Sequence, residues 1–362
     1  MNPDVLLETR GPLGLVTLNR PKALNALDLG MIRALHPALE AWAREPSVKA
    51  VVVRGAGGRA FCAGGDVRAV AASLGTPPPE GEEPLSQAFF RAEYRLNHLI
   101  HHFPKPYVAL VDGICMGGGL GLSAHGSHRV VTGKLVLAMP ETGIGLFPDV
   151  GGGWFLPRMP GESGTYLGLT GARADAADAL WLGYATRHVP AERLDALVEA
   201  LGAADWSTSE ARDVVDGVLS RFATDPGPSS LRTHAEAIAR CFAKDRVEDL
   251  LAALEAEGTP WAEQTRATLG RMSPTSLKVT LRQLRRCRGR PYDEVVAVEY
   301  RLSQHVTALP DFREGIRAVL VDKDQKPRWN PPTLAQVREE DVAACFAPLG
   351  EADWVPSAPA RS

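Results

Sequence analysis

The sequence predicts an α/β protein that ends in a helical region, and three observations support this fold class. In the first third of the chain, short apolar runs of strand length alternate with segments whose apolar residues recur at helical spacing. Glycine clusters follow two of these runs, as expected where a strand turns sharply into a helix. From Gly161 onward the apolar spacing is helical nearly to the end. We expect an α/β core with the ligand site over 1–225, a helical region over 226–350 and a flexible tail over 351–362.

The N-terminal elements follow from hydrophobic pattern and turn residues. Segments 5–9 and 13–19 predict a β-hairpin joined by a Gly-Pro turn. Asp28 is expected to cap a helix with apolar residues at 29, 32, 35, 39 and 42 on one face. Residues 50–54 predict a buried strand, and a glycine turn then leads into another helix. The Pro- and Glu-rich segment 74–84 predicts a surface loop before a helix over 85–102.

The chain is organised around residues 108–153. The apolar run 107–111 predicts a buried strand, and it turns through Gly113 into the cluster 116–119. A helix is expected to begin there, so its free N–H groups and its positive end point the same way. Such a group of donors suits a developing negative oxygen. Two acids, Glu141 and Asp149, follow in apolar and glycine-rich surroundings. Donors followed by two such acids suggest acyl chemistry.

Composition excludes several other classes of function. The 362 residues are 45% hydrophobic and 23% charged with a net charge of −3, so nothing favours nucleic acid or an anionic membrane as a partner. The five scattered cysteines show neither a disulfide framework nor zinc spacing. No apolar run approaches the ~20 residues of a membrane span. The acidic start resembles neither a signal peptide nor an Arg-rich leader, so we expect a cytoplasmic enzyme without a metal.

Other motifs are weaker. The glycines fit a dinucleotide fingerprint poorly, because Leu122 stands where the third glycine belongs and the acids are wrongly spaced. A near match to G-x-S-x-G ends in His125 instead of glycine. The histidine pairs 125/128 and 101/102 lack metal-ligand spacing and a partnering acid cluster, which favours structural roles. The arginine run over 282–290 has no interleaved aromatic residues and predicts an ion-paired helix face.

Several long motifs together resemble the crotonase (enoyl-CoA hydratase/isomerase) superfamily. They are GRAFCAGGDVRAV (58–70), GICMGGGLGLSAHG (113–126) and AMPETGIGLFPDVGGGWFLPR (138–158), with FFRAEY (89–94), SPTSLKVTLRQL (273–284) and DFREGIRAVLVDKDQKPRW (311–329). They are most similar to the branch that hydrolyses 3-hydroxyisobutyryl-CoA in valine breakdown. The resemblance implies a crotonase-type spiral of ββα turns with a C-terminal helical region, and an acyl-CoA thioester hydrolase that forms an oligomer in some members.

The resemblance also implies roles for individual residues. The N–H groups of Gly65 and Gly118 match the oxyanion hole that holds the thioester carbonyl. Glu141 matches a catalytic glutamate, which either attacks the thioester to form a mixed anhydride or activates a water. Asp149 matches a residue that contacts the substrate's 3-hydroxyl or the hydrolytic water, and Glu93 one that contacts its polar end. The structural alternatives are tight turns for the glycines, a helix start for Glu141, a helix cap for Asp149 and a solvated helix face for Glu93.

Coenzyme A binding rests on more scattered positions. The resemblance places the CoA contacts at Lys22, Leu24, Ala63 and Asp66, and two lysines near the C-terminus, Lys323 and Lys326, could reach its phosphates. The CoA belongs to the substrate, so no separate cofactor is expected.

Gly121 departs from the hydratase pattern in an informative way. In enoyl-CoA hydratases this position carries a second catalytic glutamate, because hydration needs two acids beside one water. Glycine here argues for hydrolysis, with the second acid supplied by Asp149. Two alternatives remain open: a hydratase or isomerase that uses Glu141 alone, and a non-catalytic acyl-CoA-binding protein.

Overall fold

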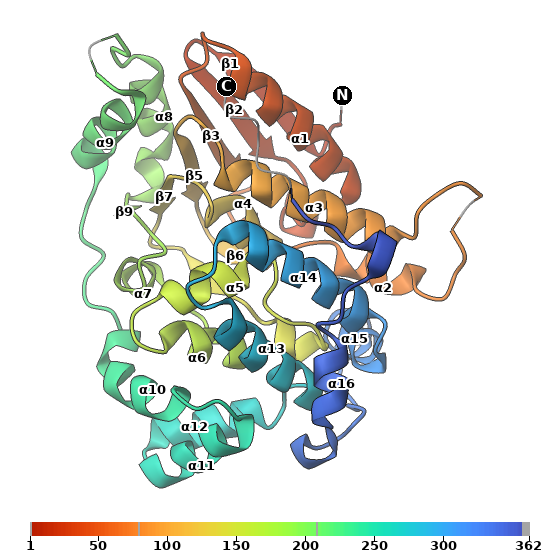
Figure 1. Ribbon diagram of the computed structural model, residues 1–362. Coiled ribbons are helices and arrows are strands. Elements are labelled where there is room, and N and C mark those ends of the chain that lie inside the picture. The colour runs from red at the N-terminus through yellow and green to blue at the C-terminus, as the bar shows by residue number, and fades with distance from the viewer. Residues whose placement is uncertain (1, 79, 208, 357–362) are drawn as a thin grey trace.

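The computed structural model describes residues 2–78, 80–207 and 209–356, and within them the strands form two sheets (Figure 1). The larger sheet has the order β1(Val5–Arg10), β2(Leu13–Leu18), β3(Ala50–Gly55), β5(Tyr107–Val111), β7(His128–Val131), β9(Arg187–His188). Its β1–β2 pair is antiparallel and all other pairs are parallel. The smaller, parallel sheet has the order β4(Ala60–Cys62), β6(Ile114–Met116), β8(Val136–Ala138).

The chain builds these sheets by repeating one unit, which confirms the expected spiral of ββα turns. Each unit adds one strand to the larger sheet, one strand to the smaller sheet and then a helix. The helices that close the three units are α2(Val67–Ser73), α4(Gly118–Ser123) and the 3-10 helix η2(Glu141–Ile144). Since the smaller strands run parallel side by side, the ends of β4, β6 and β8 lie together. The three segments that follow them therefore meet at one place.

Alternating side chains of the larger sheet enter two different cores. Val51 and Val53 of β3 join the core under α1(Leu29–Arg44) and α3(Leu85–His101), whereas Ala50 and Val52 face the core under α8(Leu194–Gly202) and α9(Ala211–Phe222). This period of two is the reason that the central strands are apolar without interruption. Figure 1 shows α1 and α3 on one side of the sheet and α8 and α9 on the other.

The expected helical region is present after residue 226. Its helices are α10(Ala235–Phe242), α11(Val247–Glu257), α12(Pro260–Leu269), α13(Pro274–Cys287), α14(Tyr292–Thr307), α15(Pro310–Ile316) and α16(Glu339–Ala344), preceded along the chain by α5(Gly152–Phe155), α6(Ser163–Thr170) and α7(Ala176–Trp181). A π-helical turn, η6(Arg317–Val321), follows α15. Helices α10–α12 form a group at one end of the molecule, while α14 lies along α3 (Figure 1). The division at residue 225 stays a prediction.

The five elements whose bounds the sequence predicted begin and end within one residue of the prediction: 5–9, 13–19, 50–54, 85–102 and 107–111. The Asp28 side chain accepts the N–H of Met31 at 2.8 Å and caps α1 as expected. In the expected tail, Asp353 pairs with Arg301 at 2.8 Å and Trp354 meets the ring edge of Tyr300. The remainder of that tail, 357–362, lies outside the described residues. Among the described helices, none combines the length and the apolar character needed to cross a membrane.

Candidate active site

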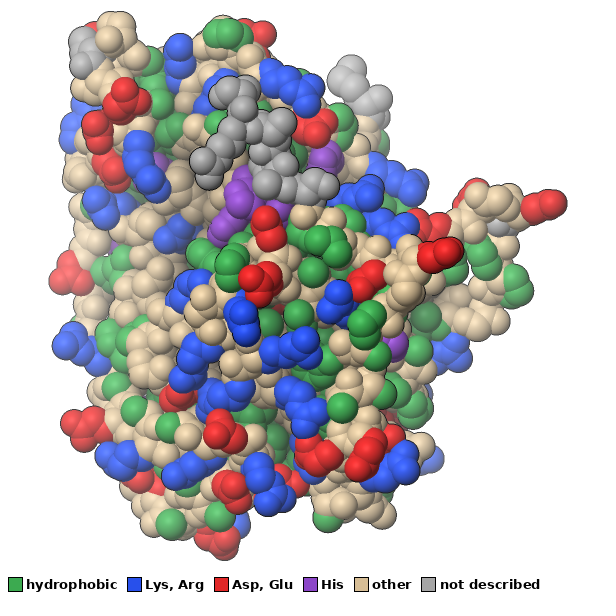
Figure 2. Space-filling model, in the orientation of Figure 1, with side chains coloured by type: hydrophobic (Ala, Val, Ile, Leu, Met, Phe, Trp, Pro, Cys, Tyr) green, Lys and Arg blue, Asp and Glu red, His purple; other side chains and the backbone are tan. Residues whose placement is uncertain are grey.

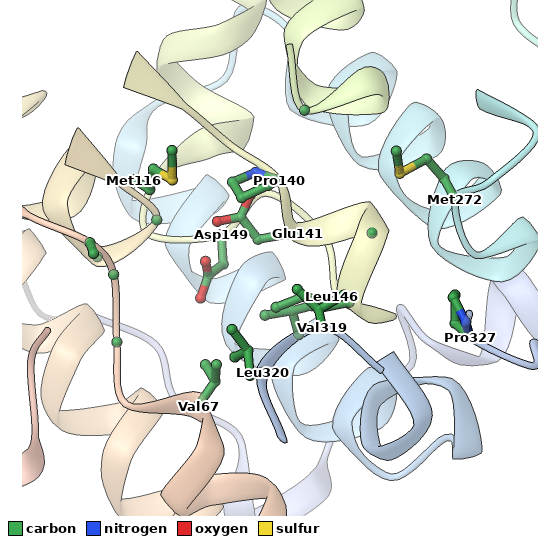
Figure 3. Close-up of a pocket in the computed structure, with 18 of the residues that line it drawn as sticks. Val67, Met116, Pro140, Glu141, Leu146, Asp149, Met272, Val319, Leu320 and Pro327 are labelled. Carbon is green, nitrogen blue, oxygen red and sulfur yellow. The ribbon is translucent and has the colours of Figure 1, made fainter. Parts of the chain in front are cut away.

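A cavity of about 490 Å³ lies where the three repeating units meet the C-terminal helices. Its walls come from the turn before α2, the start of α4, the 3-10 helix η2 and the segment after α15. Figure 3 shows Glu141 and Asp149 close together in this cavity, with Met272 and Pro327 farther toward the opposite side. The lining residues used below are Ala63, Gly65, Glu93, Gly118, Glu141, Asp149, Arg271, Val319, Leu320 and Gln325.

Two backbone amides converge in this cavity, as the resemblance implied. Around Gly65, the neighbouring N–H groups of Ala63 and Asp66 bond to the 24–27 loop at 3.0 and 2.7 Å. The N–H of Gly65 itself has no acceptor among the described residues, and neither has that of Gly118 at the start of α4. A side chain at Gly118 would begin only 3.2 Å from the Gly65 nitrogen, so the amides share one small space. They can stabilise one oxyanion together.

Glu141 is the first residue of η2 and is buried, with 5% of its surface exposed. Its Oε2 has no hydrogen-bond partner among the described residues, and its Oε1 lies beside Gly117, 3.0 Å from where a Cβ would stand. Burial, followed by the charges of Asp149 and Glu93, raises its pKa well above the ordinary value. An unpaired buried carboxyl of this kind is costly to folding, and it is a strong base or nucleophile once ionised.

Asp149 stands on the turn before α5, and its Oδ2 accepts a hydrogen bond from the Tyr94 hydroxyl at 2.8 Å. It does not cap α5, which begins at Gly152 without a side-chain cap, so the cap alternative is wrong. Burial raises its pKa from an ordinary 3.8 to about 7, although the Tyr94 bond opposes the rise. Its carboxyl can therefore exchange a proton near neutral pH.

Glu93 projects from α3 toward the two amides and not toward solvent, which rules out the solvated-face alternative. Its Oε1 is buried without a partner among the described residues. That atom lies 2.5 Å from the position of a Cβ on Gly118. Burial and then the charge of Asp149 raise its pKa well above the ordinary value. Glu93 is thus placed to contact a polar group of a substrate held on the amides.

The raised pKa of Asp149 makes folding stability depend on pH in a definite direction. With a pKa of 3.8 unfolded and about 7 folded, this carboxyl binds its proton more tightly in the folded protein. Its contribution to stability is therefore complete below pH 3.8 and is lost as pH rises through about 7, at about 1.4 kcal/mol per pKa unit. We expect Asp149→Asn, which cannot ionise, to raise Tm at pH 8 and to raise it much less at pH 5. Thermal unfolding at both pH values measures this, and an equal gain at pH 5 contradicts it.

Gly121 has a steric reason as well as a chemical one. A Cβ at this position would stand 2.8 Å from the Val150 Cβ and 2.8 Å from the Asn97 Nδ2. The space that a glutamate would need is therefore filled by the turn that carries Asp149 and by α3. The second acid enters the cavity from residue 149, and residue 121 has no room for one. This arrangement agrees with the interpretation of Gly121 from the sequence.

The segment 311–327 covers the cavity, and sequence patterns did not indicate this role. Val319 and Leu320 of η6, then Gln325, line the cavity. Arg317 holds the segment together by pairing with Glu314 at 2.9 Å and with two aspartates of the following loop. The motif 311–329 carries part of the superfamily resemblance, but nothing in its spacing shows that some of its residues line the same cavity as Glu141.

The structure brings some of the expected CoA contacts together. The N–H of Ala63 bonds to the carbonyl of Leu24 at 3.0 Å, and Ala63 lines the cavity. Lys22 is exposed on the adjacent 3-10 turn η1(Pro21–Ala23). The Asp66 carboxylate accepts the N–H of Ala69 as the cap of α2 and pairs with Arg20 at 3.4 Å, which gives that side chain a structural use. The CoA roles of these residues stay predictions.

Two lysines that were expected to reach the CoA phosphates, and one arginine that was not, lie in or beside the cavity lining. Lys323 and Lys326 are exposed in the loop that flanks Gln325. Arg271, which sequence reasoning did not single out, lines the cavity itself. Its guanidinium donates to the Ala267 carbonyl and to the Thr268 hydroxyl, both at 3.3 Å. Arg271 lies outside the motifs found in the sequence, so the sequence did not indicate that it lines the cavity.

Two of the weaker motifs have structural explanations. Arginines of the run over 282–290 form ion pairs as expected, for example Arg285 with Glu162 at 3.0 Å and Arg290 with Glu294 at 3.5 Å. Figure 2 shows Lys and Arg interspersed with Asp and Glu on this face. One acidic neighbour of these histidines was not indicated by the sequence: Asp293 of α14 accepts from His98 at 2.9 Å and from His102 at 3.0 Å. These bonds join α3 to α14 across long sequence separation.

Comparisons with known proteins agree with this geometry. The enoyl-CoA hydratase/isomerase family matches residues 13–346. Among curated proteins, 3-hydroxyisobutyryl-CoA hydrolase, mitochondrial, of Xenopus laevis is 47% identical over 96% of this chain and 90% of its own length. The human protein of that name is 45% identical over 97% of this chain and 90% of its own length.

Solved structures show the same fold over 97% of the chain. A carnitinyl-CoA dehydratase from Mycobacterium thermoresistibile has a TM-score of 0.88 at 42% identity and covers 97% of this chain and 98% of its own. An enoyl-CoA hydratase from Rhodobacter sphaeroides has a TM-score of 0.86 at 39% identity, with 97% and 99% covered. The resemblance of the sequence motifs is confirmed, and the chain belongs to the enoyl-CoA hydratase/isomerase family.

Proposed function

We propose that this protein is an acyl-CoA thioester hydrolase whose substrate is 3-hydroxyisobutyryl-CoA, an intermediate of valine breakdown. The observation that carries the proposal is the pair of buried acids, Glu141 and Asp149, facing the two convergent amides of Gly65 and Gly118, while Gly121 has no room for the second acid of a hydratase. The relatives at 45–47% identity that carry the hydrolase name support it.

The proposed chemistry begins at the thioester carbonyl. Its oxygen accepts the N–H groups of Gly65 and Gly118, which stabilise the negative charge that develops as the carbon is attacked. Either the Glu141 carboxylate attacks and forms a mixed anhydride, or it takes a proton from an attacking water. The C–S bond breaks and the CoA sulfur leaves with its electron pair to collect a proton. The sum is one thioester and one water giving one carboxylic acid and one thiol.

The acids around the amides favour a substrate with a hydroxyl group. Glu93 and Asp149 each line the cavity with the two amides, and neither carboxyl pairs with a cation among the described residues. Carboxyls with raised pKa values can donate or accept a hydrogen bond to a hydroxyl at little electrostatic cost. The apolar lining from Val319 and Leu320 suits a short branched carbon chain. Together these features favour a small 3-hydroxyacyl group.

Free-thiol release tests the proposal directly. The purified protein is given 3-hydroxyisobutyryl-CoA, 3-hydroxypropionyl-CoA, acetyl-CoA and crotonyl-CoA, and thiol is followed with a chromogenic disulfide reagent. We expect fast release from the two 3-hydroxy esters and release at least about tenfold slower from acetyl-CoA, since one buried hydrogen bond contributes about 1.4 kcal/mol or more. Consumption of crotonyl-CoA without thiol release identifies a hydratase or isomerase instead. Tight binding with no product from any ester identifies a non-catalytic binding protein.

The hydratase alternative has its own support, since two solved structures with TM-scores above 0.85 are called a dehydratase and a hydratase. The assay with crotonyl-CoA decides between the hydrolase and the hydratase. CoA acts only as part of the substrate in this proposal, and no cofactor, nucleic acid or membrane takes part. An oligomeric state and a cytoplasmic location stay predictions, and the curated relatives above are named mitochondrial.

A further inference from the structure

Glu299 of α14 is a fully buried glutamate that lies behind Asp149, outside the cavity. Its Oε2 accepts the N–H of Gly151 at 2.7 Å, and its Oε1 accepts the N–H of Gly153 at 2.8 Å. Gln283 of α13 donates to the same Oε1 at 3.0 Å. Both carboxylate oxygens therefore receive N–H donors, and two of the three donors belong to the turn that carries Asp149.

The turn that Glu299 holds is strained. Val150 has φ of +50° and is followed by Gly151 with φ of +91°. A β-branched residue rarely adopts the left-handed region, which costs of order 1–3 kcal/mol and persists only when surrounding contacts impose it. With Val150 in this conformation, the Asp149 carboxyl points into the cavity toward Tyr94 and Glu141.

Two further contacts act on the same turn from other elements. His125, which follows α4, donates from Nε2 to the Val150 carbonyl at 2.8 Å. Gln283 donates to the Pro148 carbonyl at 2.8 Å in addition to its bond with Glu299. The turn 148–153 is thus held from α13, α14 and the end of α4. Glu299 is central among these contacts, because it binds the chain on both sides of Gly152 and also orients Gln283.

We propose that Glu299 is a positioning residue for catalysis: by binding the Gly151 and Gly153 amides it fixes the strained turn at Val150 and so sets the Asp149 carboxyl against the substrate. The inference rests on the proposed thioester hydrolysis for its kinetic consequence. Its structural part, the hold on the turn, is independent of the reaction. Neither the spacing of α14 nor the family comparison assigns this residue a role.

The test is Glu299→Gln, which keeps size and shape but leaves one acceptor oxygen for three N–H donors. We expect kcat for the best thioester of the assay above to fall about 10–100-fold, with KM changed less than about threefold, because the Asp149 carboxyl is misplaced and the CoA contacts are untouched. The pH midpoint of kcat should also shift, since the surroundings of Asp149 change. Hydrogen exchange at 150–153 should accelerate, which reports the turn without any substrate.

Glu162→Gln is the matched control. Glu162 is also a buried glutamate, and its carboxylate accepts from three donors: Thr165 at 2.6 Å, Arg285 at 3.0 Å and Arg288 at 2.7 Å. Unlike Glu299, it does not hold the turn that carries Asp149. We expect it to lower Tm and to leave kcat within twofold and its pH profile unchanged. A merely structural role for Glu299 predicts the same pattern for both variants.

The outcomes separate cleanly. Glu299→Gln with kcat within twofold and an unchanged pH profile, measured well below its Tm, overturns the proposal. If that variant does not fold, Glu299→Asp takes its place; it keeps the carboxylate but draws it back by one methylene from the Gly151 and Gly153 amides, so it should lower kcat about 3–10-fold, and an unchanged kcat overturns the proposal equally. If the unsubstituted protein hydrolyses no thioester, the proposed function fails, and hydrogen exchange at 150–153 alone then decides whether Glu299 holds the turn.

Discussion

Glu141→Gln is expected to lower thioester turnover about 10³–10⁴-fold while CoA-ester binding survives. Glutamine keeps the shape of the side chain but is neither a nucleophile nor a base, and these two capacities are what the proposed step requires of Glu141. Binding should survive because the amides of Gly65 and Gly118 and the CoA contacts are unchanged. Stability should not fall, since the substitution removes a buried carboxyl with a raised pKa and an unpaired Oε2.

Thiol release gives kcat, and isothermal calorimetry with a non-hydrolysable thioether analogue gives Kd. Gln304→Glu in α14 is the control for an exchange between glutamate and glutamine outside the cavity. Because Gln304 does not line the cavity, this substitution should leave both kcat and Kd unchanged. Turnover of Glu141→Gln within tenfold of the unsubstituted protein would remove Glu141 from the mechanism. Loss of analogue binding would instead assign it to substrate recognition.

The same residue allows the two chemical roles to be told apart. If Glu141 attacks the thioester and water then opens the mixed anhydride at the glutamyl carbonyl carbon, ¹⁸O from the water enters the Glu141 carboxyl over repeated turnovers. If Glu141 only activates water, or if water opens the anhydride at the substrate acyl carbon, the label appears in the product acid and not in the protein. Label in the peptide that contains Glu141, measured by mass spectrometry, therefore identifies the covalent route.

Local patterns predicted the fold and most of the cavity because each signal lay within one short segment. Glycine-rich turns after apolar strands indicated a group of backbone donors, apolar surroundings indicated Glu141 and Asp149, and the superfamily resemblance singled out the amides of Gly65 and Gly118. The repeating ββα unit then brings these segments together, since parallel strands align their ends. The superfamily resemblance supplied the roles that residue patterns alone left open.

The tertiary contacts that hold the residues of the site in place could not be predicted in the same way. Glu299 and Asp149 are 150 positions apart, and Glu299 looks like one acid among many on an amphipathic helix. The positive φ of Val150 is invisible in a sequence, because valine is an unusual residue in that conformation. The partnership of His98 and His102 with Asp293 depends on the packing of α14 against α3. Such contacts follow from tertiary packing and have no local signature.

Gly118→Ala is expected to lower kcat/KM about 10²–10³-fold, the usual effect of disabling one oxyanion donor. The added methyl would stand 3.2 Å from the Gly65 nitrogen and 2.5 Å from the Glu93 Oε1, so it would occupy the space between the amides and the acid. Steady-state thiol release measures the loss, and calorimetry with the thioether analogue should show weakened binding as well. That double loss distinguishes this variant from Glu141→Gln.

Helix propensity alone predicts that Gly118→Ala stabilises the protein, so a loss of activity in this variant cannot be attributed to a weakened helix. Gly118 lies in α4 without a positive φ, and alanine is favoured over glycine inside a helix by about 1 kcal/mol. Gly217 in α9 is the matched control: it is also helical, and a Cβ there meets nothing within 4 Å. Gly217→Ala should raise Tm slightly and leave kcat/KM unchanged. If Gly118→Ala behaves the same way, the carbonyl does not bind between these amides. If only Gly118→Ala loses activity, the loss arises in the cavity, from the methyl group between the amides and the Glu93 carboxyl, and not from a change in helix stability.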